Sequence, residues 1–185
     1  SAAGTSCFLS AFAASLLLGL SPGKFFGIVG SVFKQLSMPL LTIASVLALA
    51  FLMNYAGMTS TLGLAFAATG TLFPFFSAML GWTGVFLTGS DTSSNALFGT
   101  LQVVTANALG LNPILTASTN AATGVMGKMI SLQSIAVAVA ATGMASSEEG
   151  RLFRITLKHS IILALFMGVV TMIFAYVLPQ LVPQV

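Results

Sequence analysis

Gly89-Ser90-Asp91-Thr92-Ser93-Ser94-Asn95 is a run without a hydrocarbon side chain, and it lies between the apolar runs 64–81 and 96–109. The chain around it has 57% hydrophobic and 5% charged residues and a mean hydropathy of +1.05, values typical of proteins embedded in membranes. At membrane depth, non-helical backbone is tolerated only where it is buried in protein or lines a watery cavity. The polar run therefore predicts a binding site inside an all-α integral membrane protein.

Charge is concentrated in two other parts of the chain. Lys24 and Lys34 flank one polar patch, and residues 146–159 hold most of the remaining charges, so that only Asp91 and Lys128 lie elsewhere. The net charge of +3 does not indicate a nucleic-acid partner, because the basic residues lie where cytoplasmic loops are expected and none alternate with aromatic residues. The positive-inside rule predicts that the loop 146–159 is cytoplasmic and that the C-terminus is periplasmic.

Chemical catalysis and metal binding are not expected. Cys7 is the single cysteine and His159 the single histidine, so neither an intramolecular disulfide nor a zinc site of ordinary composition can be built. No nucleophile–base pair can be assembled from these two residues and the three acidic residues. We therefore expect neither an enzyme nor a cofactor.

The apolar runs and the breaks between them predict how the chain crosses the lipid bilayer. Residues 1–57 are expected to form scaffold helices, residues 64–109 a hairpin, residues 111–145 a broken helix and residues 155–178 the last span. About four spanning helices result. The chain starts at Ser1 without a methionine, and we interpret it as the C-terminal part of a longer protein.

Prolines set some of the expected helix boundaries. An amphipathic piece, 24–35, precedes the span 38–56, where Pro39 lies near the helix start and its missing N–H costs least. Pro74 interrupts the first arm of the hairpin. The hairpin either dips into the membrane and returns or crosses it twice, and we favour the dip because the only charge at its tip is the acid Asp91.

Two polar runs in the chain are alike, Thr92-Ser93-Ser94-Asn95 and Ser118-Thr119-Asn120, and each precedes an apolar helix. Hydroxyl and amide side chains accept hydrogen bonds from the free N–H groups of a helix start. The positive end of the helix dipole there attracts a carboxylate or phosphate. Two such starts facing each other at mid-membrane would hold a small anion. The alternative is that both runs are ordinary N-caps at surface loops.

Helical spacing extends the polar surface beyond these runs. Asn95 and Gln102 fall on one face of the second hairpin arm, and Lys128 falls on a face of small and polar residues in the next segment. Small faces also let helices pack closely, an alternative that explains the glycines and alanines but not Gln102 and Lys128.

Asp91 and Lys128 are the two charged residues with apolar surroundings. A charge at the centre of a membrane helix costs about 2.5–3.5 kcal/mol on insertion scales and usually faces a cavity or a partner. Lys128 is suited to attract an organic anion. Burial favours the protonated form of a carboxyl, so Asp91 is suited to carry a proton. The alternative is an ion pair between the two residues that only stabilises the fold.

Three pieces of the sequence resemble the lactate permease family, the bacterial L-lactate and glycolate permeases: GWTGVFLTGSDTSSNALFGTLQ (81–102), NAATGVMGKMISLQSIAVA (120–138) and EEGRLFRITLKHS (148–160). The resemblance implies a proton-coupled monocarboxylate carrier in the inner membrane, with the N-terminal portion of the same permease as a partner. It also implies one half of an ion-transporter-type carrier built from inverted repeats. In such carriers, polar motifs at a hairpin tip and a broken helix bind the substrate.

The predicted function is secondary active transport of L-lactate, D-lactate or glycolate together with protons. Asp91 is expected to carry the coupled proton. The residues alone leave open a sodium-coupled carrier, an anion channel and a structural subunit. The substrate anion is expected to bind Ser93, Ser94, Asn95, Gln102, Ser118, Thr119, Asn120 and Lys128.

Overall fold

The structure is a computed structural model that describes residues 3–183. Every regular element of these residues is a helix, which confirms the predicted all-α class. Contacts between Cα atoms divide the chain into two compact units, Ser1–Ala44 and Ser45–Val185. Outside the description lie the side chains of Ala3, Met38, Pro39, Thr42, Ile43, Ala140 and Ser146.

The first unit consists of α1 (Ala3–Leu17) and the first part of α2 (Pro22–Tyr55). Phe25 of α2 is buried, and its ring centroid lies 5.2 Å from that of Phe12 and 5.8 Å from that of Phe8. Edge-to-face aromatic contacts of this kind stabilise the pairing of the two helices.

Helix α2 corrects the predicted boundary between the piece 24–35 and the span 38–56. It continues without interruption through Pro39, and Pro22 occupies its first position, where a missing N–H costs least. A proline inside a membrane helix is tolerated because neighbouring groups compensate for the lost hydrogen bond. Proline therefore marks the start of this helix at residue 22 and not at residue 39.

Several stretches of the described residues are long and apolar enough to cross a membrane. Two of them are single helical stretches, Gly70–Thr88 and Glu149–Tyr176. Two reach that length only as bent pairs, Ala44–Tyr55 with Met58–Ala67 at 77° and Pro113–Lys128 with Leu132–Val139 at 41°. The range of two to four spans includes the predicted number of about four, although one of them, Gly70–Thr88, contains the first hairpin arm, which the prediction counted separately.

The hairpin is shorter than the predicted segment 64–109. Its first arm begins only at α4, because residues 64–67 belong to a separate short helix and residues 70–72 to a 3-10 turn. Pro74 lies in the first turn of α4, where proline is favoured, and it does not interrupt a helix. The elements of this region are α3 (Met58–Ala67), the 3-10 helix η1 (Gly70–Leu72), α4 (Phe73–Thr88) and α5 (Asp91–Leu109).

The predicted broken helix consists of α6 (Pro113–Lys128) and α7 (Leu132–Thr142), but it breaks at residues 129–131 and not at 118–120. Asn112 caps α6, because its side chain accepts a hydrogen bond from the backbone N–H of Ile114 at 2.8 Å. Residue 118 lies more than one turn after the start of α6. The backbone N–H groups there already donate to carbonyls four residues earlier. The second polar run therefore does not cap a helix.

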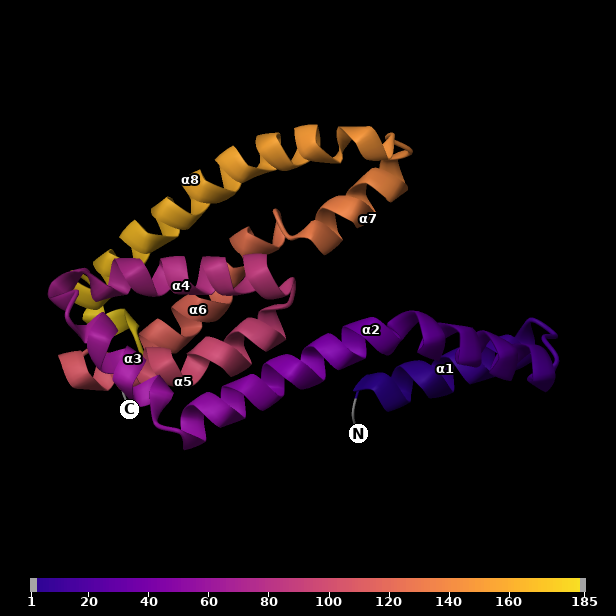
Figure 1. Ribbon diagram of the computed structural model, residues 1–185, viewed down its shortest axis with the longest axis horizontal. Coiled ribbons are helices and arrows are strands. Elements are labelled where there is room, and N and C mark those ends of the chain that lie inside the picture. The colour runs from indigo at the N-terminus through magenta and orange to yellow at the C-terminus, as the bar shows by residue number, and fades with distance from the viewer. Residues whose placement is uncertain (1–2, 184–185) are drawn as a thin grey trace. The chain divides into compact units, whose positions relative to one another are not determined.

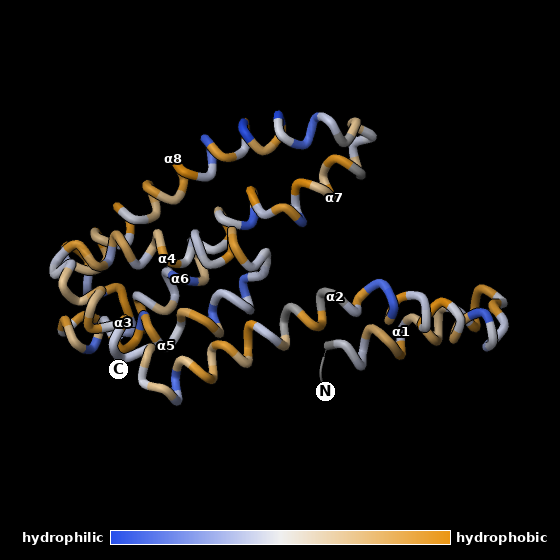
Figure 2. The backbone as a smooth tube through the Cα atoms, in the orientation of Figure 1, coloured by the Kyte–Doolittle hydropathy of each residue, from blue (hydrophilic) through white to orange (hydrophobic). Residues whose placement is uncertain are grey.

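The predicted loop 146–159 is instead the 3-10 helix η2 (Ser146–Glu148) and the start of α8 (Glu149–Tyr176), which η3 (Pro179–Leu181) follows. Acidic residues at a helix start and basic residues three or four positions later stabilise a helix, which explains why this charged sequence is not a loop. Figure 2 shows hydrophilic residues at the start of α8 and hydrophobic residues along most of the rest. The last span therefore begins six residues earlier than the predicted residue 155, at Glu149.

Helix α4 forms the centre of the second unit, where it packs against α5, α6 and α8, while α3 packs against α5 (Figure 1). A Cβ atom added to Gly127 of α6 would collide with the backbone of Trp82 in α4, so these two helices approach closely only because residue 127 is glycine. Trp82 Nε1 also donates to Ser160 Oγ of α8 at 2.8 Å. The close packing around α4 brings the polar side chains of α5 and α6 together.

Candidate functional site

The tip of the α4–α5 hairpin is a turn of two residues. Gly89 has a left-handed backbone (φ +67°), which glycine adopts readily, and it ends α4. Ser90 is extended, and its hydroxyl accepts from the backbone N–H of Ser93 at 3.3 Å as the N-cap of α5. Asp91 and the four residues after it are helical, so the prediction of open backbone over residues 89–95 was too long. Ser90, not the predicted run 92–95, caps the helix, and residues 92–95 lie within its first turns.

A chain of side-chain amides crosses from α5 to α6. Gln102 Nε2 donates to Asn120 Oδ1 at 3.2 Å, and Asn120 Nδ2 donates to Asn95 Oδ1 at 2.7 Å. Asn95 Nδ2 donates in turn to Asp91 Oδ2 at 3.0 Å. These three bonds run in one direction, from Gln102 to Asp91, and bonds in such a series polarise one another. The predicted face of Asn95 and Gln102 thus meets Asn120 of the predicted second site.

The interior of this amide chain is fully covered. Gln102, Asn120 and Ser94 are each 0% exposed. Three buried acceptors, Asp91 Oδ1, Ser94 Oγ and Gln102 Oε1, have no hydrogen-bond partner among the described residues. A buried polar atom without a partner costs about 1–3 kcal/mol, so a group of them in one bundle calls for a functional explanation.

Glycines make room for the polar atoms. A Cβ atom on Gly124 of α6 would lie 2.5 Å from Asp91 Oδ1 and 2.6 Å from the side chain of Val85. A Cβ atom on Gly84 of α4 would collide with Ser94 Oγ. Small residues at a helix interface allow the backbones to approach, and here the space that they leave is filled by Asp91 and Ser94.

The α6–α7 break lies against the hairpin tip. Lys128 is the last residue of α6, and its Nζ donates to the backbone carbonyl of Gly89. A Cβ atom on Gly89 would lie 2.9 Å from the side-chain oxygen of Gln133, so α7 also touches the tip. Ser131 caps α7 by accepting from the backbone N–H of Ser134 at 3.3 Å. Two helix breaks therefore meet, although the second is not the one that the sequence indicated.

Asp91 and Lys128 do not form the ion pair that was the alternative to a functional role. Within residues 3–183 the one ion pair joins Arg151 and Glu148 at 4.0 Å. The partner of Lys128 is a neutral carbonyl, and the partner of Asp91 is the amide of Asn95. Neither side chain therefore has an ion-pair partner among the described residues.

The residues of the second polar run divide between two faces of α6. Thr119 Oγ1 lies 3.3 Å from Thr171 Oγ1 of α8, and Asn120 joins the amide chain. Ser118 is exposed on the other side of the helix, away from these contacts. Of the predicted substrate residues on α5, Ser93 and Ser94 are buried and Asn95 is half-buried.

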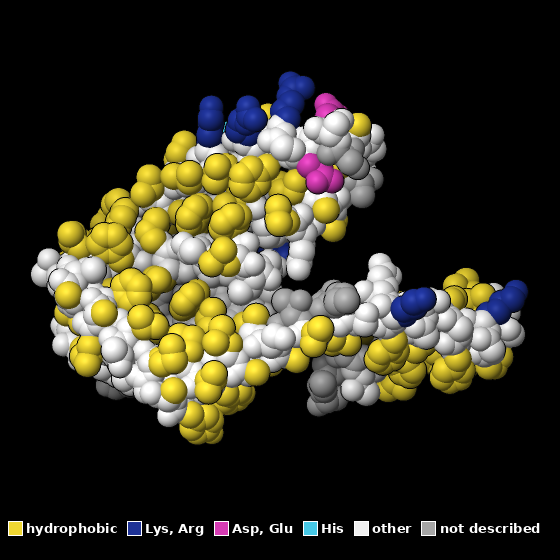
Figure 3. Space-filling view, viewed as in Figure 1, with side chains coloured by type: hydrophobic (Ala, Val, Ile, Leu, Met, Phe, Trp, Pro, Cys, Tyr) yellow, Lys and Arg dark blue, Asp and Glu magenta, His cyan; other side chains and the backbone are white. Residues whose placement is uncertain are grey.

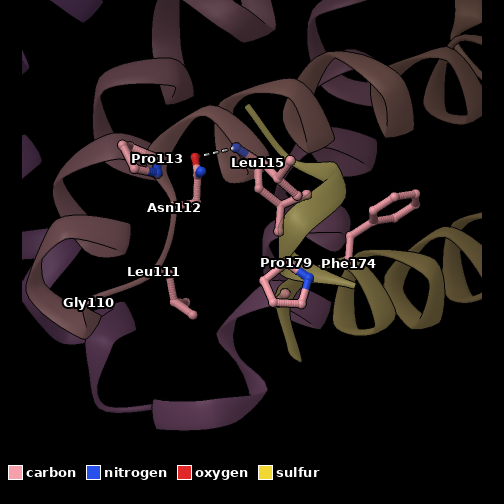
Figure 4. A pocket seen from close by; sticks show the side chains of 9 residues that line it. Gly110, Leu111, Asn112, Pro113, Leu115, Phe174 and Pro179 are labelled. Carbon is pink, nitrogen blue, oxygen red and sulfur yellow. Dashed lines mark hydrogen bonds between the residues drawn. The ribbon is translucent and has the colours of Figure 1, made fainter. Parts of the chain in front are cut away.

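The sequence analysis placed the start of the broken helix near residue 111 but did not recognise Asn112 as its cap, although Asn112-Pro113 is a recognisable signal for a helix start. Asn112 also donates to the carbonyl of Pro183 at 2.7 Å. A pocket of about 350 Å³ lies beside it, and Figure 4 shows Asn112, Leu115, Phe174 and Pro179 around this pocket. It lies at the far end of α5 from Asp91, and so it is separate from the amide chain.

A hollow of about 360 Å³ lies where the hairpin tip meets α7. Thr88 and Gly89 line it from the hairpin, and Ser131 and Gln133 from α7. Pockets of about 300–1,000 Å³ are the size that holds small molecules. Its other lining residues are apolar: Phe86, Leu87, Leu132 and Phe153. The hollow is thus large enough for a small molecule, but only part of its lining is polar.

Comparison with known proteins identifies the family of this chain. Its residues 1–178 match the family described as L-lactate permease. It is 52% identical to glycolate permease GlcA of Escherichia coli (strain K12) over 177 residues, 96% of this chain and 31% of that protein. It is 49% identical to an L-lactate permease of Salmonella typhi over 183 residues, 99% of this chain and 33% of that protein.

A third relative, an L-lactate permease of Bacillus subtilis (strain 168), is 45% identical over 181 residues, 98% of this chain and 32% of that protein. No solved structure matches the chain. The chain spans about a third of the length of these relatives. Its apolar helices and these matches mark it as part of a multi-pass membrane protein. The chain belongs to the L-lactate permease family.

Proposed function

We propose that this chain is part of a carrier that moves small 2-hydroxy monocarboxylates (L-lactate, D-lactate or glycolate) across the bacterial inner membrane together with protons. The names of its relatives, a glycolate permease and L-lactate permeases, supply the substrate class. The observation that carries the proposal is the buried amide chain from Gln102 to Asp91, which links the hairpin to the broken helix.

The substrate would bind at the start of α5. A 2-hydroxy acid needs donors for its carboxylate and both donors and acceptors for its hydroxyl. The hydroxyls of Ser93 and Ser94 and the amide of Asn95 supply these groups, and the N-terminus of α5 adds the positive end of the helix dipole. On α6, Thr119 and Asn120 would complete the site. The amides would exchange their bonds with one another for bonds to the substrate.

Lys128 would supply the compensating positive charge. Its side chain is exposed, and its present partner is the neutral carbonyl of Gly89. A carboxylate is a stronger acceptor for an ammonium group than a carbonyl. An arriving anion would therefore draw Lys128 away from Gly89 and free the hairpin tip. This links occupation of the site to movement of the two breaks.

Two of the proposed substrate ligands, Gln102 and Ser118, lie farther from the start of α5. Gln102 lies deeper in the bundle at the other end of the amide chain, and it would align Asn120 for the substrate. Ser118 faces outward from α6, so it would contact substrate only on the exposed side of that helix. The geometry supports the roles of Asn95 and Asn120 most strongly.

Asp91 would carry the coupled proton. Its Oδ2 accepts from Asn95, while its buried Oδ1 has no partner and lies against Gly124. A proton on Oδ1 would make the side chain neutral and weaken the bond from Asn95, because hydrogen bonds to a charged acceptor are stronger. Asn95 would then be free to donate to the substrate. Loss of the proton on the other side of the membrane would restore the bond and expel the anion.

The rest of the transport machinery would come from the remainder of the same permease, with the lipid bilayer as the surroundings. We propose that the start of α8 is cytoplasmic, because Arg151, Arg154 and Lys158 cluster there. The C-terminus would then be periplasmic. The orientation of α8 is compatible with either form of the α4–α5 hairpin, and we propose the re-entrant one. Residues 89–95 hold no cation, and this supports a tip inside the membrane because a cytoplasmic tip would be expected to carry positive charge.

Uptake of radiolabelled lactate into proteoliposomes holding the full-length protein tests the coupling. We expect accumulation that requires an inward proton gradient and proceeds without sodium. Oxygen-rich sites also suit Na⁺, so accumulation that requires a sodium gradient would replace the proton by sodium. Uptake that does not saturate would indicate an anion channel. Absence of lactate and glycolate uptake would overturn the proposed substrate class.

A further inference from the structure

We propose that the start of α8 binds the phosphate group of an anionic phospholipid, whose acyl chain lies along the apolar side of the same helix. This site is distinct from the amide chain and does not depend on the transported substrate. It rests on three observations: a cluster of three cations, two of which have no acidic partner among the described residues, a hollow between them, and an exposed apolar stripe that continues from them.

The cations lie on one side of α8. Arg151, Arg154 and Lys158 follow one another at steps of three and four residues, so they project from the same side of the helix. Arg151 lies 4.0 Å from Glu148, with side chains 78% and 41% exposed, and such a pair in water contributes little. In the described part of the chain, Arg154 and Lys158 have no acidic partner.

A hollow of about 620 Å³ lies among these side chains. Figure 3 shows Lys and Arg side chains gathered at one end of α8 and hydrophobic side chains beyond them. Two guanidinium groups and an ammonium group around one hollow match a phosphate diester, whose oxygens accept several charged hydrogen bonds. The hollow is lined by Ser147, Gly150, Arg151, Arg154, Ile155, Lys158 and His159.

An apolar stripe continues the basic side of α8 toward the membrane interior. Ile155, Ile162, Phe166 and Val169 are 51%, 63%, 61% and 51% exposed. Their spacings of seven, four and three residues keep them on the side of Lys158. From Lys158 to Val169 the helix rises about 16 Å, close to half the thickness of the hydrocarbon layer. One acyl chain of one leaflet fits this length.

A phospholipid is the ligand that uses both parts of the surface. Basic pockets at the cytoplasmic ends of membrane helices bind the head groups of anionic lipids, and each nearby cation strengthens this binding. A free phosphate ion would contact the cations but would leave the stripe without a role. Because only a lipid would contact both the cations and the apolar stripe, we favour a phospholipid over a free phosphate ion.

Lipid binding by the full-length protein in detergent tests the proposal, with phosphatidylglycerol added in increasing amounts and bound lipid counted by native mass spectrometry. The double variant Arg154→Gln, Lys158→Gln should bind phosphatidylglycerol about 30-fold more weakly, since each cation near the head group contributes about fivefold. The matched control is Lys24→Gln, Lys34→Gln, which removes the same charge from α2 and should change the affinity less than twofold.

Two further variants separate the head group from the tail and guard against misfolding. Arg154→Lys, Lys158→Arg keeps the charge and should keep the affinity, whereas Ile162→Ser, Phe166→Ser should weaken lipid binding with all cations present. Equal affinity for phosphatidylcholine, or equal losses in the α2 control, would overturn the site. Displacement of the lipid by an equal concentration of inorganic phosphate would show that phosphate alone is the ligand and would overturn it too.

Discussion

The two polar runs of this chain are nearly alike in composition but differ in structure. Ser93, Ser94 and Asn95 form the first turns of α5, directly after a glycine turn and a serine cap. Ser118, Thr119 and Asn120 lie in the middle of α6, whose cap is Asn112. Hydroxyl and amide residues cap a helix only at its start, where the backbone N–H groups have no carbonyl partner. Elsewhere their side chains bond across helices, as Asn120 does to Asn95.

The largest expected effect comes from removing the one residue that links the two runs. Asn120→Ala leaves Asn95 Oδ1 and a donor of Gln102 without a partner in the bundle interior, at about 1–3 kcal/mol for each group. Lactate uptake by the full-length protein should fall about tenfold or more. Val125→Ala, on the exposed side of the same helix, is the control and should stay within about twofold. Equal effects would show that the two faces of α6 do not differ.

A smaller loss is expected from filling the space beside Asp91. In Gly124→Ala the new Cβ would lie 2.5 Å from Asp91 Oδ1, and such overpacking costs about 1–3 kcal/mol. Gly99→Ala in α5 meets no atom within 4 Å and should be neutral or stabilising by up to about 1 kcal/mol. Thermal unfolding of the two variants in detergent compares them. If both variants melt alike, α6 does not pack tightly on the start of α5.

A loss of stability of similar size is expected from changing the glycine turn that precedes the first run. Gly89→Ala places a side chain in left-handed backbone, which costs about 1–2 kcal/mol, and also touches Gln133. In Gly143→Ala the backbone strain is the same, but the new Cβ atom has no neighbouring atom within 4 Å. Gly89→Ala should therefore lower the unfolding temperature more than Gly143→Ala. Adding Gln133→Ala should remove the difference, and a difference that persists would place the contact elsewhere.

The smallest expected effects concern the caps themselves. Ser90→Ala and Ser131→Ala each remove an N-cap hydroxyl, at about 1 kcal/mol, because the backbone N–H groups of Ser93 and Ser134 lose an acceptor. Ser118→Ala removes a hydroxyl inside a helix and should change the melting temperature by less than either. A loss at Ser118 as large as at Ser131 would mean that α6 is also broken near residue 118.

Much of this arrangement follows from the sequence, and the remainder has identifiable causes. Composition determines an all-α membrane protein, and the glycine at residue 89 locates the hairpin tip. Helical spacing predicts that Asn95 and Gln102 share a face. The break at 129–131 could not be located, because no proline or glycine marks it and Ser131 resembles any other serine. The bond between Asn95 and Asn120 depends on packing of α5 against α6, which spacing within one helix does not determine.

The central claim is that Asp91 couples the amide chain to the proton, and the most direct measurement is transport by Asp91→Asn in proteoliposomes with the full-length protein. Lactate counterflow, which needs no driving force, should persist, whereas accumulation driven by an inward proton gradient should be lost. The asparagine side chain keeps an oxygen that can accept a hydrogen bond from Asn95, but it cannot gain or lose the coupled proton. Gradient-driven accumulation equal to that of the wild type would contradict the account.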